Sequence, residues 1–375
     1  MTPSKIIQRI PLLDLKTQYI SLREEIDDAI SHVLKAGQFV LGANVDAFEQ
    51  EMADYLGVRH AIGVASGTDA LVIALRALEI GVGDEVIVPS YTFFATAEAV
   101  LQVGAIPVLV DIDPATYCID VGQIEASITA RTAAIIPVHL YGHPAAMTPL
   151  MSIARQHGLK VIEDNAQAIG ARYRGRRTGS IGDAGCLSFF PSKNLGAFGD
   201  AGMLVTNTDR VAEHARMLRA HGWSRKYFPE MVGYNSRLDE IQAAILRVKL
   251  PHLDAWNDKR RSIADRYRSR LADAGAGLPP EAPDVSHVYH LFVIRVPHRQ
   301  RIQQFLREEG IASNVYYPKA LHELGPCSDA VRTATLVESE RASTEALAIP
   351  LYPEMDDEAV DRVAEAVIGA LDEAS

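Results

Sequence analysis

The stretch Gly182-Asp-Ala-Gly-Cys-Leu-Ser-Phe-Phe-Pro-Ser-Lys193-Asn-Leu-Gly-Ala-Phe-Gly-Asp-Ala-Gly202 holds one lysine among apolar, glycine and small polar residues. No other cationic residue occurs between Arg177 and Arg210. A lysine kept among apolar neighbours can have a lowered pKa, and its neutral amine is then available as a nucleophile or base. Alone, the stretch also fits a surface loop with a solvated lysine. The neighbouring segments decide between these two interpretations.

Apolar runs typical of strands surround this stretch and alternate with helical patterns. Seven such runs occur, at residues 61–65, 85–88, 107–110, 133–138, 160–163, 185–190 and 203–206. Helical patterns lie between most of them, at residues 70–78, 95–103, 123–128 and 147–157, and two more precede them, at 18–36 and after a capping Asn44. The alternation predicts an α/β domain with a mostly parallel seven-stranded sheet covered on both faces. In such sheets a cofactor binds outside the carboxyl ends of the strands.

The last third of the chain has a different pattern. A long helical stretch at residues 237–270 is interrupted by Pro251, which predicts a split or a kink. Residues 275–283 have the composition of a linker, and a strand at 288–296 and helices at 300–309 and 357–371 follow. A chain of 375 residues is long for one core. We therefore expect a large domain over residues 1–250 and a smaller α+β domain over residues 251–375.

Composition limits the classes of function. The formal net charge is −11 and Lys/Arg runs are absent, which argues against nucleic-acid binding. Three cysteines cannot all pair, which favours a reducing compartment. The N-terminus lacks an apolar core of signal-peptide length, and no apolar run is long enough to span a membrane. The sequence therefore predicts a cytoplasmic protein without a nucleic-acid or membrane partner.

The sequence does not predict a metal site. Cys118, Cys186 and Cys327 have no metal-ligand spacing. His139 and His143 have the i, i+4 spacing of a metal pair, but the glycine between them and the proline after them argue against a helix.

The segment Ala65-Ser-Gly-Thr-Asp-Ala70 follows a strand and opens a helix. Free backbone N–H groups at a helix N-terminus attract a phosphate, and Gly67 would let that phosphate approach closely. The alternative is an ordinary strand-to-helix turn in which Ser66 or Thr68 only caps the helix. The segment matches neither the Walker A nor the G-x-G-x-x-G pattern, so it does not indicate ATP or a dinucleotide.

Two further stretches place a carboxylate and an aromatic ring at the same edge of the sheet. Asp164 ends an apolar strand, where a buried carboxylate needs a cation such as a protonated pyridine nitrogen. Gln167 could hydrogen-bond the phenolic oxygen of that ring, and Phe93 could stack on it. Alone, Asp164 could be a capping aspartate and Phe93 a core residue. Together with Lys193 and the phosphate turn they predict a pyridoxal phosphate site.

Several ordered motifs resemble those of the DegT/DnrJ/EryC1/StrS sugar aminotransferases. They are Ser66-Gly-Thr-Asp-Ala-Leu71, Glu163-Asp-Asn-Ala-Gln167, Ser188-Phe-Phe-Pro-Ser-Lys193, Gly199-Asp-Ala-Gly202 and Gly233-Tyr-Asn-Ser-Arg-Leu-Asp-Glu-Ile-Gln242. The resemblance runs from Ile10-Pro-Leu-Leu-Asp14 to the region of Tyr316-Tyr-Pro318 and His322. It implies the aspartate aminotransferase-type, or type I, fold and a homodimer with active sites at the interface.

The resemblance implies a role for each matching residue. Lys193 would hold pyridoxal 5'-phosphate as a Schiff base, Asp164 would pair with the pyridine nitrogen, and Gln167 would contact the phenolate oxygen. Phe93 stands where the family places its stacking aromatic. The phosphate contacts would be Gly67, Thr68 and Ser188, with Asn235 reaching the phosphate from the neighbouring subunit.

The resemblance also implies an activity. Some members replace the lysine by histidine and become dehydratases, so the retained Lys193 implies transamination. L-Glutamate would leave its amino group on the cofactor as pyridoxamine 5'-phosphate, and a keto sugar on a nucleotide diphosphate would then accept it. Residues 221–239 resemble members that aminate C-3 of deoxyhexoses more than those acting at C-4. A catalytically idle regulator and another class of pyridoxal phosphate enzyme remain alternatives; a regulator is expected to lose Lys193 or Asp164.

The implied substrate contacts are Arg225, Lys226, Tyr316, Tyr317 and His322. Arg225 or Lys226 could bind the two phosphates of the nucleotide, although a solvated basic loop fits them equally. Tyr316 occupies a position that the family often fills with histidine, in the region where its small domain closes over the sugar.

Overall fold

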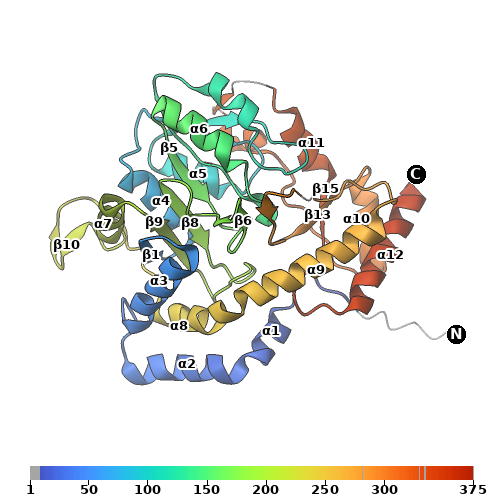
Figure 1. The fold of residues 1–375 in the computed structure, drawn as a ribbon, viewed down its shortest axis with the longest axis horizontal. Coiled ribbons are helices and arrows are strands. Elements are labelled where there is room, and N and C mark those ends of the chain that lie inside the picture. Colours follow the sequence, from blue (N-terminus) through green and yellow to red (C-terminus); the bar gives the residue numbers. More distant parts are fainter. Residues whose placement is uncertain (1–8, 281, 329, 333–334, 375) are drawn as a thin grey trace.

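The apolar runs form one central sheet in the computed structural model of the chain (Figure 1), which describes residues 9–280, 282–328, 330–332 and 335–374. Its strands are β1 (His60–Val64), β2 (Glu85–Pro89), β3 (Ile106–Val110), β4 (Thr132–Ile135), β5 (Lys160–Asp164), β8 (Ala184–Ser188), β9 (Gly202–Thr206) and β14 (Val331–Arg332). Their spatial order is β1-β9-β8-β5-β4-β2-β3-β14. Neighbours from β8 to β14 pair in parallel, and β9 is antiparallel to both β8 and β1. The seven predicted strands and the mostly parallel sheet are confirmed, and β14 adds a short eighth strand.

Residues 1–8, which belong to the N-terminus expected to lack a signal peptide, lie outside the described range.

Helices cover both faces of the sheet because alternate residues of a strand point to opposite sides. Val86 and Val88 of β2 pack into one core, whereas Ile87 between them packs into another. The first face carries α4 (Gly67–Ala77), α5 (Ala95–Gln102) and α7 (Asp209–Leu218), and the second carries α3 (Ala43–Leu56), α6 (Met147–His157) and α8 (Glu240–Lys249). The predicted α/β layering is therefore present.

The C-terminal part of the chain has a separate apolar core. Tyr267, Phe292 and Val363 belong to it. Its elements are α9 (Leu253–Leu271), α10 (Arg299–Glu308), α12 (Asp357–Ala374) and the antiparallel pair β13 (Phe292–Arg295) and β15 (Ala346–Ile349). The long helical stretch is split as expected, because a 3-10 turn at Leu250–His252 around Pro251 separates α8 from α9. The boundary at residue 250 stays a prediction.

Smaller elements complete the fold. They are α1 (Leu15–Ser21), α2 (Arg23–Ala36), α11 (Val337–Glu345), the strands β6 (Arg172–Tyr173), β7 (Arg176–Arg177) and β12 (Val285–Ser286), and the hairpin of β10 (Trp223–Arg225) with β11 (Phe228–Pro229). In Figure 1 this last hairpin projects from the body of the molecule beyond α7. Within the described ranges, none of the helices has the length and apolar character needed to cross a membrane.

Three predicted helix details are wrong. The helix expected at 18–36 is broken at Leu22, because the Ser21 hydroxyl donates to the Gln18 carbonyl and competes with the helical hydrogen bonds. The segment 123–128 forms only two 3-10 turns, since so short a segment cannot offset the cost of helix nucleation. The α3 helix begins before Asn44, and the distant carboxylate of Glu240 caps it instead.

Candidate active site

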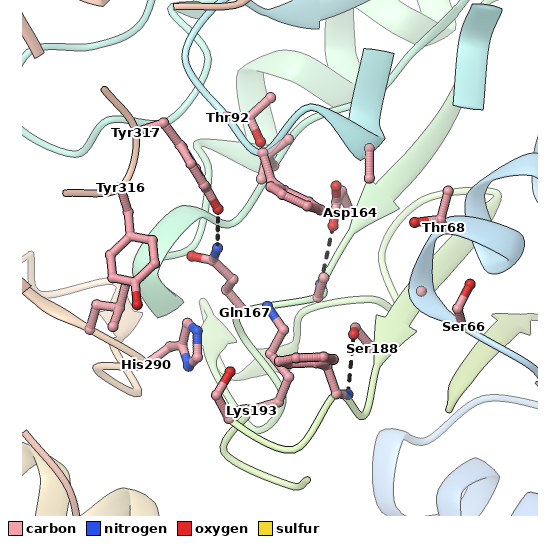
Figure 2. A pocket seen from close by; sticks show the side chains of 18 of the residues that line it. Ser66, Thr68, Thr92, Asp164, Gln167, Ser188, Lys193, His290, Tyr316 and Tyr317 are labelled. Carbon is pink, nitrogen blue, oxygen red and sulfur yellow. Dashed lines mark hydrogen bonds between the residues drawn. The ribbon is translucent and has the colours of Figure 1, made fainter. Parts of the chain in front are cut away.

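A cavity of about 440 Å³ opens at the carboxyl ends of the parallel strands. Residues at the ends of β5 and β8, and residues a few positions after β1 and β2, line it, so the topology brings distant segments to one place. Of the sequence-predicted residues, nine line this cavity: Gly67, Thr68, Phe93, Asp164, Gln167, Ser188, Lys193, Tyr316 and Tyr317. Figure 2 shows Lys193, Asp164 and Gln167 grouped in it, with Ser66, Thr68 and Ser188 on the side of α4.

Lys193 lies in the loop that follows β8 and lines the cavity. Desolvation lowers the pKa of its ammonium to about 8, and the charge of Asp164 opposes this shift only in part. Near pH 8 a large fraction of the side chain is therefore a neutral amine, which is the form that attacks a carbonyl or accepts a proton.

Asp164 ends β5 and is buried. The Thr96 hydroxyl donates to its Oδ2 at 2.9 Å, and the Ala166 N–H donates to its Oδ1 at 3.2 Å. Desolvation nevertheless raises the pKa of this carboxyl above its usual value, although the two hydrogen bonds and the charge of Lys193 lower it. A carboxylate in this state is stabilised most by a further cation in direct contact.

The preceding residue, Glu163, has a structural role because it accepts hydrogen bonds from neighbouring segments of the chain. Burial by itself would raise the pKa of its carboxyl, but hydrogen bonds from His139 and from the backbone of Gly182 and Gly179 hold the pKa below its usual value. The His139 ring lies 3.0 Å from Glu163 and also accepts from the Ala145 N–H. His139 is thus engaged in the scaffold, and no cluster of metal-ligating side chains occurs among the residues that the structure covers.

The N-terminus of α4 forms the anion-attracting side of the cavity. The Ser66 hydroxyl caps the helix by accepting from the Asp69 N–H at 3.1 Å. A Cβ atom at Gly67 would stand 2.7 Å from the Cβ of Ser188, so only glycine lets α4 pack this closely against the end of β8. This contact brings the Thr68 and Ser188 hydroxyls to one wall, together with the positive end of the helix dipole.

Gln167 has a fixed orientation. Its Oε1 accepts from the Tyr141 N–H at 2.7 Å, and its Nε2 donates to the Tyr317 hydroxyl at 3.1 Å (Figure 2). The amide NH₂ therefore faces the cavity as a donor. The Phe93 ring centroid lies 5.7 Å from that of Tyr317, and 56 % of Phe93 is exposed. An aromatic residue this exposed inside a cavity has surface available for stacking on a planar group.

Four sequence-predicted residues do not line this cavity. Arg225 and Lys226 are exposed on the β10–β11 hairpin, where they lie over the rings of Phe228 and Tyr227. Asn235 is exposed and pairs through its backbone with Ala220. His322 is buried between Ser90 and Glu340.

Among the polar residues of the site that the sequence interpretation missed, Thr96 and His290 have the most specific contacts. Thr96 is the hydroxyl donor to Asp164, and His290 contributes a buried imidazole to the cavity wall. Thr96 stands in an apolar helical pattern and His290 in an apolar strand-like run. A single polar residue in such a pattern is usually a buried residue whose hydrogen bonds are satisfied within the core. A polar side chain in such a run was the only signal available.

The residues present fit pyridoxal 5'-phosphate. Asp164 is a desolvated carboxylate that gains from a pyridinium partner, and Lys193 supplies a partly neutral amine for an aldehyde. The N-terminus of α4 and the Ser188 hydroxyl offer donors for a phosphate at the same cavity.

Comparisons with known proteins agree with this geometry. A Geobacillus stearothermophilus protein named "Pleiotropic regulatory protein" is 48% identical over 363 residues, 96% of this chain and 97% of that protein. The Acidithiobacillus ferrooxidans UDP-N-acetyl-3-dehydro-alpha-D-glucosamine 3-aminotransferase is 50% identical over 355 residues, 95% of this chain and 96% of that protein.

Solved structures also match over nearly the whole chain. DesV of S. venezuelae, crystallised with a ketimine intermediate, has a TM-score of 0.94 at 46% identity and covers 97% of this chain and 98% of its own. The NtdA structure from Bacillus subtilis, with its bound cofactor PMP, has a TM-score of 0.91 at 36% identity, covering 98% of this chain and 86% of its own. The family model of the DegT/DnrJ/EryC1/StrS aminotransferase family matches residues 20–368. The chain therefore belongs to the DegT/DnrJ/EryC1/StrS aminotransferase family, as its motifs predicted.

Proposed function

We propose that this chain transfers the amino group of L-glutamate to a keto-deoxysugar that is linked to a nucleotide diphosphate, with pyridoxal 5'-phosphate as cofactor. One observation carries the proposal: the Lys193 amine, the desolvated Asp164 carboxylate and the N-terminus of α4 meet in one cavity. The names of the A. ferrooxidans relative and of the family support the substrate class.

The chain's own residues divide the chemical work. When bound, the cofactor supplies an electron sink for the bond broken at the donor α-carbon. Lys193 would accept the proton from that carbon and deliver it to C4′ of the cofactor, because its lowered pKa makes both protonation states accessible. Asp164 keeps the pyridine nitrogen protonated through a desolvated ion pair. Gln167 offers its amide N–H to the phenolate oxygen, since its carbonyl is already occupied.

We favour C-3 as the carbon that receives the amino group. The A. ferrooxidans relative is named a 3-aminotransferase and is 50% identical over 95% of this chain. Residues 221–239 resemble the C-3 members as well. The alternative is C-4, and it is favoured less because a second relative, from Streptomyces venezuelae, is also named for a 3-amino sugar and is 47% identical over 96% of this chain.

We further propose a homodimer in which the partner completes each site. Lys193 is the one Lys or Arg among the described residues of the cavity wall, yet the substrate brings two phosphates in addition to that of the cofactor. Arg225, Lys226 and Asn235 are exposed and do not line the cavity of their own chain. Placed against a second copy, the projecting hairpin can deliver these groups to the partner's cavity.

We assign the reaction to the cytoplasm, since the three cysteines are free thiols, which favours a reducing compartment.

Absorbance spectroscopy tests the proposal. Protein supplied with pyridoxal 5'-phosphate should show a band near the visible edge, and L-glutamate should convert that band to one in the ultraviolet. A panel of nucleotide-linked 3-keto and 4-keto sugars should then reverse the change, and the more efficient set identifies the carbon. Lys193→Ala should abolish turnover; full activity in that variant would contradict the assignment of the amine.

The second candidate is a catalytically idle regulator, which the name of the G. stearothermophilus relative brings to attention. Retention of Lys193 with a lowered pKa beside Asp164 favours the enzyme. A chain that binds no pyridoxal 5'-phosphate even in excess would reverse this preference. A chain that binds it but transfers no amino group from glutamate to any keto sugar of the panel would belong to another class of pyridoxal phosphate enzyme.

A further inference from the structure

His290 lies at the inner wall of the cavity and is held from behind by a chain of amides. Its Nδ1 is 3.2 Å from Asn194 Oδ1. Asn194 Nδ2 donates to Asn257 Oδ1 at 2.8 Å and to the Val288 carbonyl at 3.0 Å, and Asn257 Nδ2 donates to the Ile169 carbonyl at 3.1 Å. All three side chains are buried.

This chain of hydrogen bonds fixes which ring nitrogen carries the proton. The Ile169 and Val288 carbonyls can only accept, so the NH₂ groups of both asparagines must face them. Asn194 Oδ1 is then an acceptor, and His290 Nδ1 must be the donor. In a neutral ring, Nε2 is consequently left with a lone pair and acts only as an acceptor.

The surroundings keep the ring neutral. Desolvation lowers the pKa of His290 well below its usual value, and the charges of Lys193 and Arg260 lower it further. Arg260, on α9, donates to the carbonyls of Tyr289 and Leu351. In Figure 2 the His290 ring stands on the cavity wall, with Lys193 on one side and Tyr316 on the other. Among the described residues, Lys193 and Arg260 are the charged groups that act on the pKa of His290, and Tyr316 stands beside the ring.

We propose that His290 is a positioning residue whose Nε2 accepts a hydrogen bond from the Lys193 amine, and that Asn194 and Asn257 fix the tautomer this requires. The inference rests on the proposed role of Lys193. Lys193 and His290 line the same cavity, so an N–H of the amine that is donated to Nε2 would leave the nitrogen lone pair directed away from the ring. When Lys193 has taken up a proton, a neutral acceptor stabilises the ammonium, whereas an imidazolium would repel it.

Asn194→Asp tests the inference through its pH profile. A carboxylate at this position stabilises the imidazolium and raises the pKa of His290. The rate of the glutamate-driven absorbance change, measured by stopped flow on the holoenzyme, should then fall about tenfold per pH unit below the new pKa. The wild type and the exposed control Asn207→Asp should lack this additional limb and follow only the ionisation of Lys193. His290→Gln should be slower at every pH, and the double variant Asn194→Asp/His290→Gln should lose the limb.

A wild-type profile in Asn194→Asp, or a limb that persists in the double variant, would overturn the inference. Nitrogen NMR of ¹⁵N-histidine-labelled wild-type protein gives a readout that needs neither activity nor a foldable variant. It should show His290 protonated at Nδ1 and unprotonated at Nε2 at pH 7, with an Nε2 shift that changes in Lys193→Ala; the opposite tautomer would refute the inference. A wild type that does not respond to glutamate would count against the proposed function, while the NMR result would still decide the state of His290.

Discussion

Glu163 and Asp164 are neighbours in the sequence, yet they do different work because successive strand residues point to opposite sides. Glu163 receives its hydrogen bonds from His139 and a turn of backbone, and its carboxyl has a lowered pKa. Asp164 faces the cavity, where desolvation raises its pKa. The sequence identified Asp164 from its place at the end of an apolar run. It could not show that Thr96 would donate to it, because that contact joins residues 68 positions apart.

Asp164→Asn removes the charge while keeping the shape. The amide cannot hold a pyridine nitrogen in its protonated form, so we expect a loss of about 10²–10³ in kcat. The cofactor should still bind, since the lysine and the helix N-terminus remain. Steady-state kinetics with glutamate and the preferred keto sugar measure the effect. Asp209→Asn, at an exposed carboxylate paired with Arg59, is the control and should retain activity; equal losses in both variants would show that Asp164 has no special role.

Lys193 should lower the stability of the cofactor-free protein. Its ordinary pKa of 10.5 falls to about 8 on folding, so between these values the unfolded chain binds more protons and stability rises with pH. Lys193→Met should therefore raise the free energy of unfolding by about 1–3 kcal/mol at pH 7. The gain should shrink between pH 8 and pH 10.5.

Urea unfolding at several pH values measures this difference. The exposed Lys35→Met is the control and should change stability little at any pH. A Lys193→Met protein that is less stable than the wild type at pH 7 would show that the attraction of the ammonium to Asp164 outweighs the cost of burying the charge.

At the scale of elements, the strands were predictable and some helix ends were not. Apolar runs locate strands because a sheet covered on both faces needs apolar residues throughout. The start of α3 depends instead on Glu240, nearly 200 positions away. Its carboxylate accepts from the Gly42, Asn44 and Val45 N–H groups at 3.0, 2.6 and 3.2 Å. Local sequence patterns do not reveal such a contact, which is why the sequence favours Asn44 as the cap.

Glu240→Ala should destabilise the fold through this helix end. The change leaves N–H groups of the first turn of α3 without their charged acceptor in a largely buried place, at a cost of about 2–4 kcal/mol. Urea unfolding followed by circular dichroism measures the loss. Glu51→Ala, which removes a half-exposed ion pair with Arg247, should cost less than about 1 kcal/mol. Similar losses in the two variants would mean that the cap contributes no more than a surface charge.

At the scale of the whole molecule, the chain is acidic overall but carries exposed cations where its hairpin projects. The net charge is −11, and Arg225 and Lys226 stand on the β10–β11 hairpin with exposed Tyr227 and Phe228 beside them. The sequence predicted both residues as substrate contacts without placing them. In a single chain they do not line the cavity, so that prediction depends on a second copy and stays open.

Subunit complementation tests the shared site directly. One variant carries Lys193→Ala; the other carries Arg225→Ala, Lys226→Ala and Asn235→Ala together, and each should be inactive alone. In a mixed dimer one cavity combines an intact Lys193 with the intact hairpin of the partner, while the other cavity has lost both. Random reassembly makes about half of the dimers mixed, with one working site each, so co-refolded protein should recover about a quarter of wild-type activity. Mass-selected mixed dimers should carry all of it. If each chain instead served its own cavity, every site in the mixture would lack either the amine or the hairpin groups, and co-refolding would recover nothing.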